Sequence, residues 1–277
     1  QDSLQEQPLR KIQNTEVPAL GFGTFQLKGD VCRQAVLCAL ETGYRHIDTA
    51  RMYENEKAVG QALQDYGAKR ESLFLTSKVW YDQLAPHDIR REVQDSLRLL
   101  QTEYLDLVLI HWPNPDYPLS QSLEALFRLK DEGVIRQVGV SNFTPSLIEQ
   151  AWKTGPLFCN QVECHPLLRQ EKLRKMAAEK GFLLTAYSPL AQGKVHNEST
   201  LNAIGKKHGR CPEQVALAWL LSLPVVSPIP RSSQQEHIQS NFQSIGVQLD
   251  SEDLEAIEAI PDNQRQVDPA MAPDWEY

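Results

Sequence analysis

Four side chains that together could deliver a proton to a carbonyl oxygen occur at Asp48, Tyr53, Lys78 and His111. Apolar residues flank Lys78, so its ammonium is expected to be partly desolvated and to need Asp48 as a counter-ion. An ammonium beside a phenol favours the phenolate, which predicts a lowered pKa for Tyr53. His111 would add a second hydrogen bond to the same oxygen. The set predicts a site for general acid catalysis with Tyr53 as the acid.

Each of these four residues also has an ordinary structural explanation when it is considered alone. A lone strand-end lysine is commonly a surface residue, and a lone histidine is commonly part of the core. Asp48 could cap a helix, and Tyr53 could be a packed aromatic residue. Only their joint placement favours the catalytic interpretation, so the elements that position them decide the question.

Short apolar or β-branched runs alternate with helical patterns along the whole chain. Apolar residues spaced by three and four, the signature of an amphipathic helix, occur at Ile89, Val93, Leu97 and Leu100. Strands are predicted over residues 18–25, 45–50, 73–79, 105–111, 135–142, 159–165, 183–189 and 224–230. Helices are predicted over residues 31–42, 55–66, 86–100, 120–132, 145–154, 170–180 and 212–222.

This alternation predicts an α/β fold with a parallel sheet and right-handed crossovers. Eight such units without a linker fit a (β/α)8 TIM barrel better than an open sheet, and 277 residues suit one barrel. We therefore expect a single domain over residues 1–277. Residues 1–16 are expected to form a tail or hairpin. A short hairpin over residues 4–18 could close the bottom of the barrel. Residues 262–277 are expected to be a loop.

Composition excludes several classes of protein. Hydrophobic residues make up 41% and charged residues 23% of the chain, and the formal net charge of −8 argues against a nucleic-acid partner. No apolar run approaches the roughly 18 residues of a membrane helix, and residues 1–10 lack the apolar core of a secretory signal. The five cysteines form no C-x-x-C pair, which predicts reduced thiols, no metal site and a cytoplasmic location. Scattered charge favours a monomer.

Polar side chains gather at the predicted carboxyl ends of the strands, where barrel enzymes carry their sites. Besides the first four residues, this group contains Ser141, Asn142, Gln161, Glu163, His165, Tyr187, Ser188, Arg231 and Ser232.

Five motifs in chain order resemble the aldo-keto reductase family. They lie at residues 43–50 with Tyr53, Glu56 and Gly60, and at residues 109–113, 138–143, 160–166 and 229–232. The resemblance runs from about residue 17 to the C-terminus. The ending, residues 267–269 with 272–275, is similar to the bacterial 2,5-diketo-D-gluconate reductase and methylglyoxal reductase branch of that family.

The resemblance implies that Asp48, Tyr53, Lys78 and His111 are a catalytic tetrad. It also implies a nicotinamide cofactor lying across the barrel mouth, and no G-x-G-x-x-G follows any predicted strand. The implied reaction is hydride transfer from nicotinamide C4 to small aldehydes, to dicarbonyls such as methylglyoxal, or to keto-sugar acids such as 2,5-diketo-D-gluconate.

The resemblance further implies which residues bind the cofactor. Ser141, Asn142 and Gln161 match the groups that bind the nicotinamide carboxamide, and Tyr187 matches the aromatic ring that stacks on it. The remaining cofactor residues are expected to be Gly23, Thr24, Asp48, Ser188, Leu190, Gly193, Arg231, Ser232, His237 and Asn241.

The expected cofactor is NADPH, because Arg231 with Ser232 would hold a 2′-phosphate and a guanidinium binds phosphate through two hydrogen bonds. Two departures weaken this preference over NADH. His237 stands where the family commonly has an arginine, and Ser240 stands where a glutamate often contacts the adenine.

The resemblance implies a substrate pocket with walls of Phe25, Trp80 and Trp112 around Tyr53 and His111, although each wall residue could instead be ordinary packing. The segment 113–119 is short and so is the C-terminal tail. A small, open pocket favours compact dicarbonyls or keto-sugars over steroids.

Two other functions compete with carbonyl reduction. One is a nucleotide-binding member of the same fold family without catalysis, against which the complete tetrad argues. The other is a barrel glycosidase that uses paired carboxylates, for example Asp48 and Glu163. The glycosidase hypothesis leaves Lys78 and Arg231 without a role.

Overall fold

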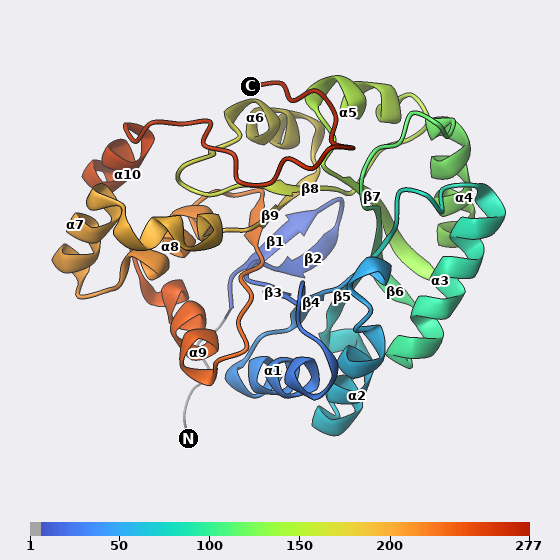
Figure 1. Cartoon of the computed structure of the whole chain (residues 1–277), viewed down its shortest axis with the longest axis horizontal. Helices are drawn as coiled ribbons and strands as arrows, with labels where there is room; N and C mark the ends of the chain where they lie inside the picture. The colour runs from blue at the N-terminus through green and yellow to red at the C-terminus, as the bar shows by residue number, and fades with distance from the viewer. Residues whose placement is uncertain (1–6) are drawn as a thin grey trace.

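The computed structural model describes residues 7–277, and its helices surround a ring of eight parallel strands (Figure 1). The strands are β3 (Phe22–Gly23), β4 (His46–Asp48), β5 (Phe74–Val79), β6 (Leu105–Ile110), β7 (Ile135–Ser141), β8 (Cys159–Glu163), β9 (Leu183–Tyr187) and β10 (Val226–Pro228). The helices are α1 (Gly29–Thr42), α2 (Glu56–Tyr66), α3 (Pro86–Leu100), α4 (Leu119–Asp131), α5 (Pro145–Trp152), α6 (Glu171–Lys180), α7 (Ser199–His208), α8 (Pro212–Leu221), α9 (Gln235–Gln243) and α10 (Ser251–Glu258).

Each strand pairs in parallel with the next in the chain, from β3 to β10. The first and last strands meet through two backbone hydrogen bonds, from Gly21 N to Pro228 O at 2.9 Å and from Gly23 N to Pro230 O at 3.0 Å. These bonds close the ring. The predicted (β/α)8 barrel is confirmed.

The structure differs from the prediction mainly in the bounds of three strands and in three additional helices. The strand predicted over 18–25 is only Phe22–Gly23, because Pro18 ends a separate strand below it. The strand predicted over 224–230 is only Val226–Pro228, because the prolines at both ends of that run cannot donate to a strand ladder. The strand predicted over 159–165 ends at Glu163. Helices α7, α9 and α10 were not among the predicted helices.

An antiparallel hairpin of β1 (Leu9–Ile12) and β2 (Thr15–Pro18) covers the amino ends of the barrel strands. Gln13 and Asn14 make its turn, and both have positive φ, as the type I′ hairpin turn requires. Ile12 and Val17 pack against the first residues inside the barrel, Phe74, Leu107, Phe158, Cys159 and Leu183. The predicted bottom hairpin is confirmed, and the part of that prediction on residues 1–6 lies outside the described residues.

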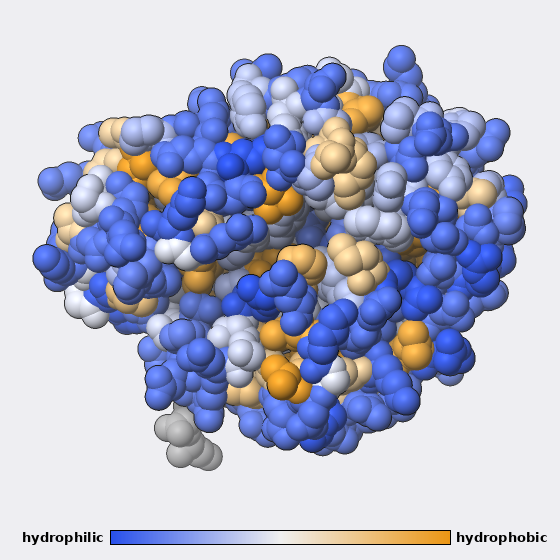
Figure 2. All heavy atoms as spheres, in the orientation of Figure 1, coloured by the Kyte–Doolittle hydropathy of each residue, from blue (hydrophilic) through white to orange (hydrophobic). Residues whose placement is uncertain are grey.

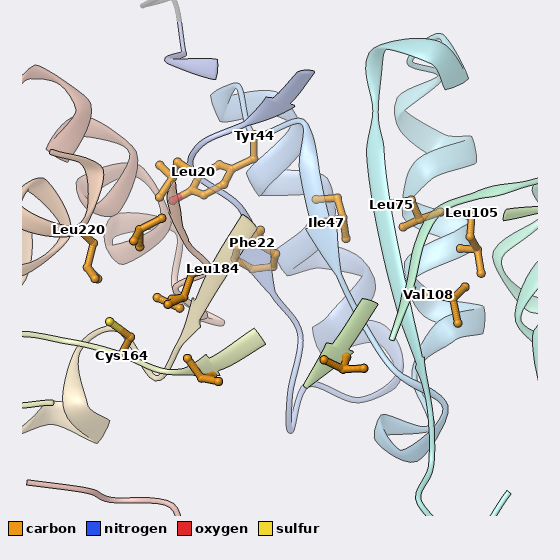
Figure 3. Close-up of a cluster of buried hydrophobic side chains, with 14 of the residues drawn as sticks. Leu20, Phe22, Tyr44, Ile47, Leu75, Leu105, Val108, Cys164, Leu184 and Leu220 are labelled. Carbon is orange, nitrogen blue, oxygen red and sulfur yellow. The ribbon is translucent and has the colours of Figure 1, made fainter. Parts of the chain in front are cut away.

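Residues along each barrel strand alternate between the barrel interior and the layer under the helices. Leu75 of β5 and Ile47 of β4 belong to the large hydrophobic core between the strands and the helices. Figure 3 shows both side chains in this core. Phe74 belongs instead to the interior cluster at the barrel bottom. Lys78 is four residues beyond Phe74, so it points into the barrel near the carboxyl end. Asp48 is directed inward by the same alternation.

The remaining expectations concern the tail, the thiols and membrane segments. Residues 262–277 form no helix or strand and cross the mouth side of the ring in Figure 1. All five cysteines are free, and Cys32, Cys159 and Cys164 are buried. Within residues 7–277, no helix combines the length and the apolarity that crossing a membrane would require.

Candidate active site

The carboxyl ends of the strands surround a cavity of about 850 Å³. Figure 2 shows this face of the molecule, hollowed near its centre. The lining comes from widely separated parts of the chain, from Gly23 after the hairpin to Met271 in the C-terminal segment. The ring of strands therefore gathers these residues at one place, as the strand-end pattern predicted.

The structure brings Asp48, Tyr53, Lys78 and His111 together at the bottom of this cavity. Asp48 ends β4, Lys78 lies near the end of β5, and His111 directly follows β6. Tyr53 ends the short 3-10 helix η1 (Arg51–Tyr53), which follows β4. Lys78 Nζ donates to Asp48 Oδ1 at 2.5 Å, to Tyr53 Oη at 2.9 Å and to Thr49 O at 3.2 Å. All three ammonium protons are thus used, one of them on the phenol.

The ion pair of Lys78 and Asp48 is buried behind Tyr53. Both residues are 1% exposed, and Gln161 Nε2 donates to the second carboxylate oxygen, Asp48 Oδ2, at 2.7 Å. Lys78 does not line the cavity, whereas Tyr53 and His111 do. A buried charge that loses its partner is strongly destabilising. The Asp48 carboxylate therefore stabilises the Lys78 ammonium in its buried position behind the tyrosine.

The pKa of Tyr53 is raised above its ordinary value, which corrects the prediction of a lowered pKa. Burial disfavours the phenolate most, and the neighbouring Asp48 carboxylate adds to this; the Lys78 ammonium opposes both without reversing them. For Lys78, burial lowers the pKa, but Asp48 and Tyr53 outweigh burial and the net shift is upward. At neutral pH the phenol keeps its proton and the ammonium keeps its charge.

His111 is neutral at physiological pH, because burial and the nearby Lys78 charge lower its pKa well below the ordinary value. Its Nδ1 is buried and has no hydrogen-bond partner within residues 7–277. The ring lies edge-on to Tyr53 and to Trp80, with centroid distances of 5.6 Å and 5.1 Å. A neutral imidazole carries one N–H, so it can donate a single hydrogen bond to a ligand.

The residues predicted to hold a nicotinamide carboxamide form one hydrogen-bonded group beside the tetrad. Ser141 Oγ donates to Gln161 O at 2.8 Å, Asn142 Nδ2 donates to His111 O at 3.1 Å, and Tyr187 Oη donates to Asn142 Oδ1 at 2.6 Å. Gln161 Oε1 accepts no hydrogen bond from the described residues. This oxygen would suit a carboxamide N–H, so the lining fits a nicotinamide group.

Residues after β3 and β9 complete this side of the cavity. Gly23, Thr24, Ser188, Leu190 and Gly193, all expected to bind the cofactor, belong to the lining. A Cβ on Gly23 would lie 2.9 Å from Ile229 O, so the close approach of the two closing strands requires glycine there.

Arg231 is the only lysine or arginine among the described lining residues. Its Nη1 donates to Phe25 O and to Gln26 Oε1, both at 2.9 Å, so it spans the rim between the two closing strands. The other residues predicted for the adenosine end do not line the cavity. Ser232 makes a local turn with Gln234 N at 3.0 Å, while His237 (exposed) and Asn241 (buried) lie on α9.

The three predicted wall residues, Phe25, Trp80 and Trp112, all line the cavity, so core packing alone does not account for them. Phe25 stands at the rim with 45% of its surface exposed, 5.3 Å from the Tyr53 ring. Trp112 is 6% exposed and packs against Trp275 at 6.1 Å.

Sequence reasoning missed part of the lining. Two glutamines, a methionine and the C-terminal wall belong to it as well: Gln26, Gln192, Met52, Gln266, Val267, Asp268, Pro269 and Met271. The motif at residues 267–269 could have indicated the C-terminal wall. It identified only a branch of the family, and it did not predict where these residues lie in the fold.

The glycosidase hypothesis finds no support in the carboxylates. Glu163 is fully buried and does not line the cavity. Backbone N–H groups and His165 occupy its oxygens, and Asp48 is engaged by Lys78 and Gln161. The pair thus offers no free acid and base across a substrate. Among residues 7–277, no cluster of three metal-ligating side chains occurs.

Comparison with known proteins agrees with this geometry. The family model described as "Aldo/keto reductase family" matches residues 19–262. The chain is 41% identical over 266 residues to methylglyoxal reductase DkgB of Escherichia coli O157:H7, covering 94% of this chain and 99% of that protein. It is 38% identical over 259 residues to the glyoxal reductase of Bacillus subtilis, covering 92% and 93%.

A solved structure shares the whole architecture. The crystal structure of a candidate 2,5-diketo-D-gluconic acid reductase B superposes with a TM-score of 0.95 at 36% identity and covers 98% of both chains. The tetrad geometry, the barrel and these matches agree. The chain belongs to the aldo/keto reductase family, whose members are oxidoreductases that act on carbonyl groups.

Proposed function

We propose that the protein reduces small carbonyl compounds with NADPH and uses Tyr53 as the general acid. The observation that carries this proposal is that Tyr53 lines the cavity while its hydroxyl oxygen lies 2.9 Å from the buried ammonium of Lys78. A phenol in this position can release its proton only to an oxygen that becomes strongly basic during the reaction. A carbonyl oxygen that develops alkoxide charge is such an oxygen.

The residues of the chain divide the work on the substrate oxygen. When bound, the nicotinamide cofactor supplies the hydride that adds to the carbonyl carbon. Tyr53 donates a hydrogen bond to the carbonyl oxygen and then transfers its proton to it, which completes the alcohol. The Lys78 ammonium stabilises the phenolate that remains, and the neutral His111 donates the second hydrogen bond.

Ser141, Asn142 and Gln161 would hold the carboxamide, and Tyr187 would lie against the ring. Arg231 supports the preference for NADPH, because it is the one described cationic side chain on the lining that could bind a 2′-phosphate. His237 supplies no fixed charge, so NADH is expected to serve as a weaker cofactor.

The proposed substrates are compact aldehydes and dicarbonyls, with methylglyoxal as the first choice. The relatives named methylglyoxal reductase and glyoxal reductase support dicarbonyls, and the diketogluconic acid reductase neighbour supports keto-sugar acids as further substrates. The aromatic walls of Trp80 and Trp112 suit small, partly apolar carbonyl compounds.

The test is the loss of NADPH absorbance after methylglyoxal is added to the purified protein, with NADH in a parallel assay. Steady, enzyme-dependent oxidation of NADPH is expected. A nucleotide-binding protein without catalysis would instead bind NADPH, with a change in its fluorescence, and leave the absorbance constant. That result with a panel of aldehydes, dicarbonyls and keto-sugars would overturn the proposal.

A further inference from the structure

Strand β8 ends in a carboxylate that the proposed reaction does not use. Glu163 is fully buried, does not line the cavity and forms no hydrogen bond with a lysine or arginine of residues 7–277. Burying a carboxylate is costly unless hydrogen bonds replace its water. Its partners therefore indicate what the side chain does.

These partners belong to the C-terminal segment. Gln266 N donates to both oxygens of Glu163, at 3.1 Å and 2.9 Å, and Val267 N donates to Oε1 at 2.8 Å. The Arg265 guanidinium lies 3.8 Å from the same oxygen. Two successive backbone N–H groups from the end of the chain are thus bound to the end of β8.

His165 supplies a further hydrogen bond to the Glu163 carboxylate. His165 Nδ1 accepts a hydrogen bond from Leu167 N at 3.2 Å, so the proton of a neutral ring is on Nε2. Nε2 then donates to Glu163 Oε2 at 2.7 Å. Hydrogen bonds from His165 and from the backbone N–H groups of Gln266 and Val267 fix the Glu163 carboxylate. The carboxylate in turn fixes the position of the backbone at Gln266 and Val267.

The segment bound by Glu163 is a wall of the substrate cavity, since residues 266–269 belong to the lining. Further along, Trp275 packs against Trp112 and donates from Nε1 to Asp268 Oδ1 at 2.9 Å. The Arg265 guanidinium lies 3.5 Å from the centroid of the Trp275 ring. Figure 1 shows this segment, in red, crossing beside β8.

We propose that Glu163 is a positioning residue that sets the affinity and size selectivity for the carbonyl substrate by fixing residues 266–269 as a cavity wall. The donors are main-chain N–H groups of Gln266 and Val267, so the Glu163 side chain links the end of β8 directly to the backbone of the wall. The Glu163 side chain makes no hydrogen bond to the tetrad or to Ser141, Asn142 and Gln161, although its backbone pairs with Tyr187 across β8 and β9. Its loss should therefore loosen the carbonyl pocket and spare the proton-transfer machinery. This inference rests on the proposed reductase function.

The first test is Glu163→Gln in the full-length protein. A glutamine offers one acceptor oxygen and turns an N–H toward the donors at Gln266 and Val267. We expect the KM for methylglyoxal to rise about tenfold, while kcat and the Kd for NADPH stay within about twofold. Glu163→Asp, which keeps both oxygens, should recover part of the loss.

The second test approaches the same wall from the other side. Trp275→Ala removes the contacts with Trp112 and Asp268 and leaves β8 intact, so it should fold even if Glu163→Gln does not. Both variants should change the ratio of kcat/KM for methylglyoxal to that for the larger phenylglyoxal in the same direction. Glu258→Gln, a matched change of an exposed glutamate on α10, should leave KM and this ratio unchanged.

The outcomes separate the two proposals. If wild-type protein oxidises no NADPH with any carbonyl compound, the proposed function fails. If the wild type turns over but Trp275→Ala and the folded Glu163 variants keep its KM and its size ratio, the positioning role of Glu163 is wrong. A fall in kcat with unchanged KM in both variants would contradict it equally.

Discussion

At the scale of single residues, the proposed acid catalysis depends on the hydroxyl proton of Tyr53. Removing the hydroxyl in Tyr53→Phe keeps the ring that packs beside Phe25 and His111. We expect reduction to fall by a factor of about 10²–10⁴, the usual contribution of a general acid, with the Kd for NADPH unchanged. Single-turnover absorbance and fluorescence titration measure the two quantities. Turnover near the wild-type rate would show that another group donates the proton.

The pH dependence follows from the directions of the two pKa shifts. The pKa of Tyr53 lies above its ordinary value, and that of His111 lies well below its own. Both groups therefore stay neutral between about pH 7 and pH 9. We expect kcat/KM for carbonyl reduction at saturating NADPH to be flat across this range. A decline with a midpoint near pH 8 would mean that Lys78 outweighs burial in the working enzyme.

Under the proposed function, Arg231 would control the choice between NADPH and NADH. Arg231→Gly removes the one described cation on the cavity lining, so binding of NADPH should weaken by about 10–100-fold, the usual value for charge-assisted hydrogen bonds. Binding of NADH, which has no 2′-phosphate, should change by less than about threefold. Calorimetric titration of both cofactors checks this, and an equal loss for both would contradict the 2′-phosphate assignment.

Much of the site could be predicted at this scale, because strand alternation and strand ends determine which side chains meet. Asp48, Lys78 and Gln161 occupy inward positions on their strands, and their hydrogen bonds follow from that placement. The pKa of Tyr53 could not be predicted in this way. It depends on how completely the folded barrel removes water from the phenol, and no local pattern contains that information.

At the scale of secondary structure, helix α10 depends on a charged cap. The backbone N–H of Asp253 donates to Asp250 Oδ1 at 2.9 Å, and the backbone N–H of Asp250 donates to Asp253 Oδ2 at 3.1 Å. The side chains of Lys207 and His208 also donate to the Asp253 carboxylate. Burial raises the pKa of Asp253, but these hydrogen bonds outweigh it and lower the pKa to about 2. The cap therefore ties α10 to the end of α7.

Asp253→Asn should lower the free energy of unfolding by about 1 kcal/mol at pH 7, a typical value for a lost cap. Because the pKa is lowered in the folded state, this stabilisation is complete above about pH 4 and is lost as the pH falls toward 2. The difference between variant and wild type should shrink as the pH falls from about 4 to about 2 in urea unfolding. A difference independent of pH would exclude the charge as its source.

Helix prediction succeeded where amphipathic spacing is regular and failed where it is not. Helix α3 has the predicted bounds Pro86–Leu100, starting with a proline in its first turn. Helices α9 and α10 are 9 and 8 residues long, and tertiary contacts stabilise such short segments more than their own pattern does. The acidic pair at Asp250 and Asp253 was the usable start signal for α10.

At the scale of the whole molecule, the bottom hairpin supports the last strand. Arg10 is 8% exposed, and its guanidinium donates to Val226 O at 2.8 Å and to Leu221 O at 2.7 Å. Burial lowers its pKa to about 10, which leaves it charged at neutral pH. It thus links β1 to β10, beside the two hydrogen bonds that close the ring.

Arg10→Met should destabilise the fold by about 1–3 kcal/mol, because two carbonyl groups lose a charged donor. The expected decrease in Tm is several degrees. Arg91→Met is the matched control, because that guanidinium is 53% exposed and makes surface pairs of little energetic weight. Thermal unfolding followed by circular dichroism measures both. Equal decreases in Tm for the two variants would show that the buried contacts of Arg10 stabilise the fold no more than an exposed surface pair does.

The placement of the chain ends has a practical consequence. The hairpin that begins the described chain covers the floor of the barrel, whereas the last residues pack beside the opening, with Trp275 on Trp112 and Glu276 bonded to Ser146. A fusion partner or affinity tag joined after Tyr277 would crowd the entrance to the pocket. Attachment at the amino end would leave it open, so immobilised enzyme should be oriented that way, and kinetic comparisons among variants are best made on protein with an untouched carboxyl end.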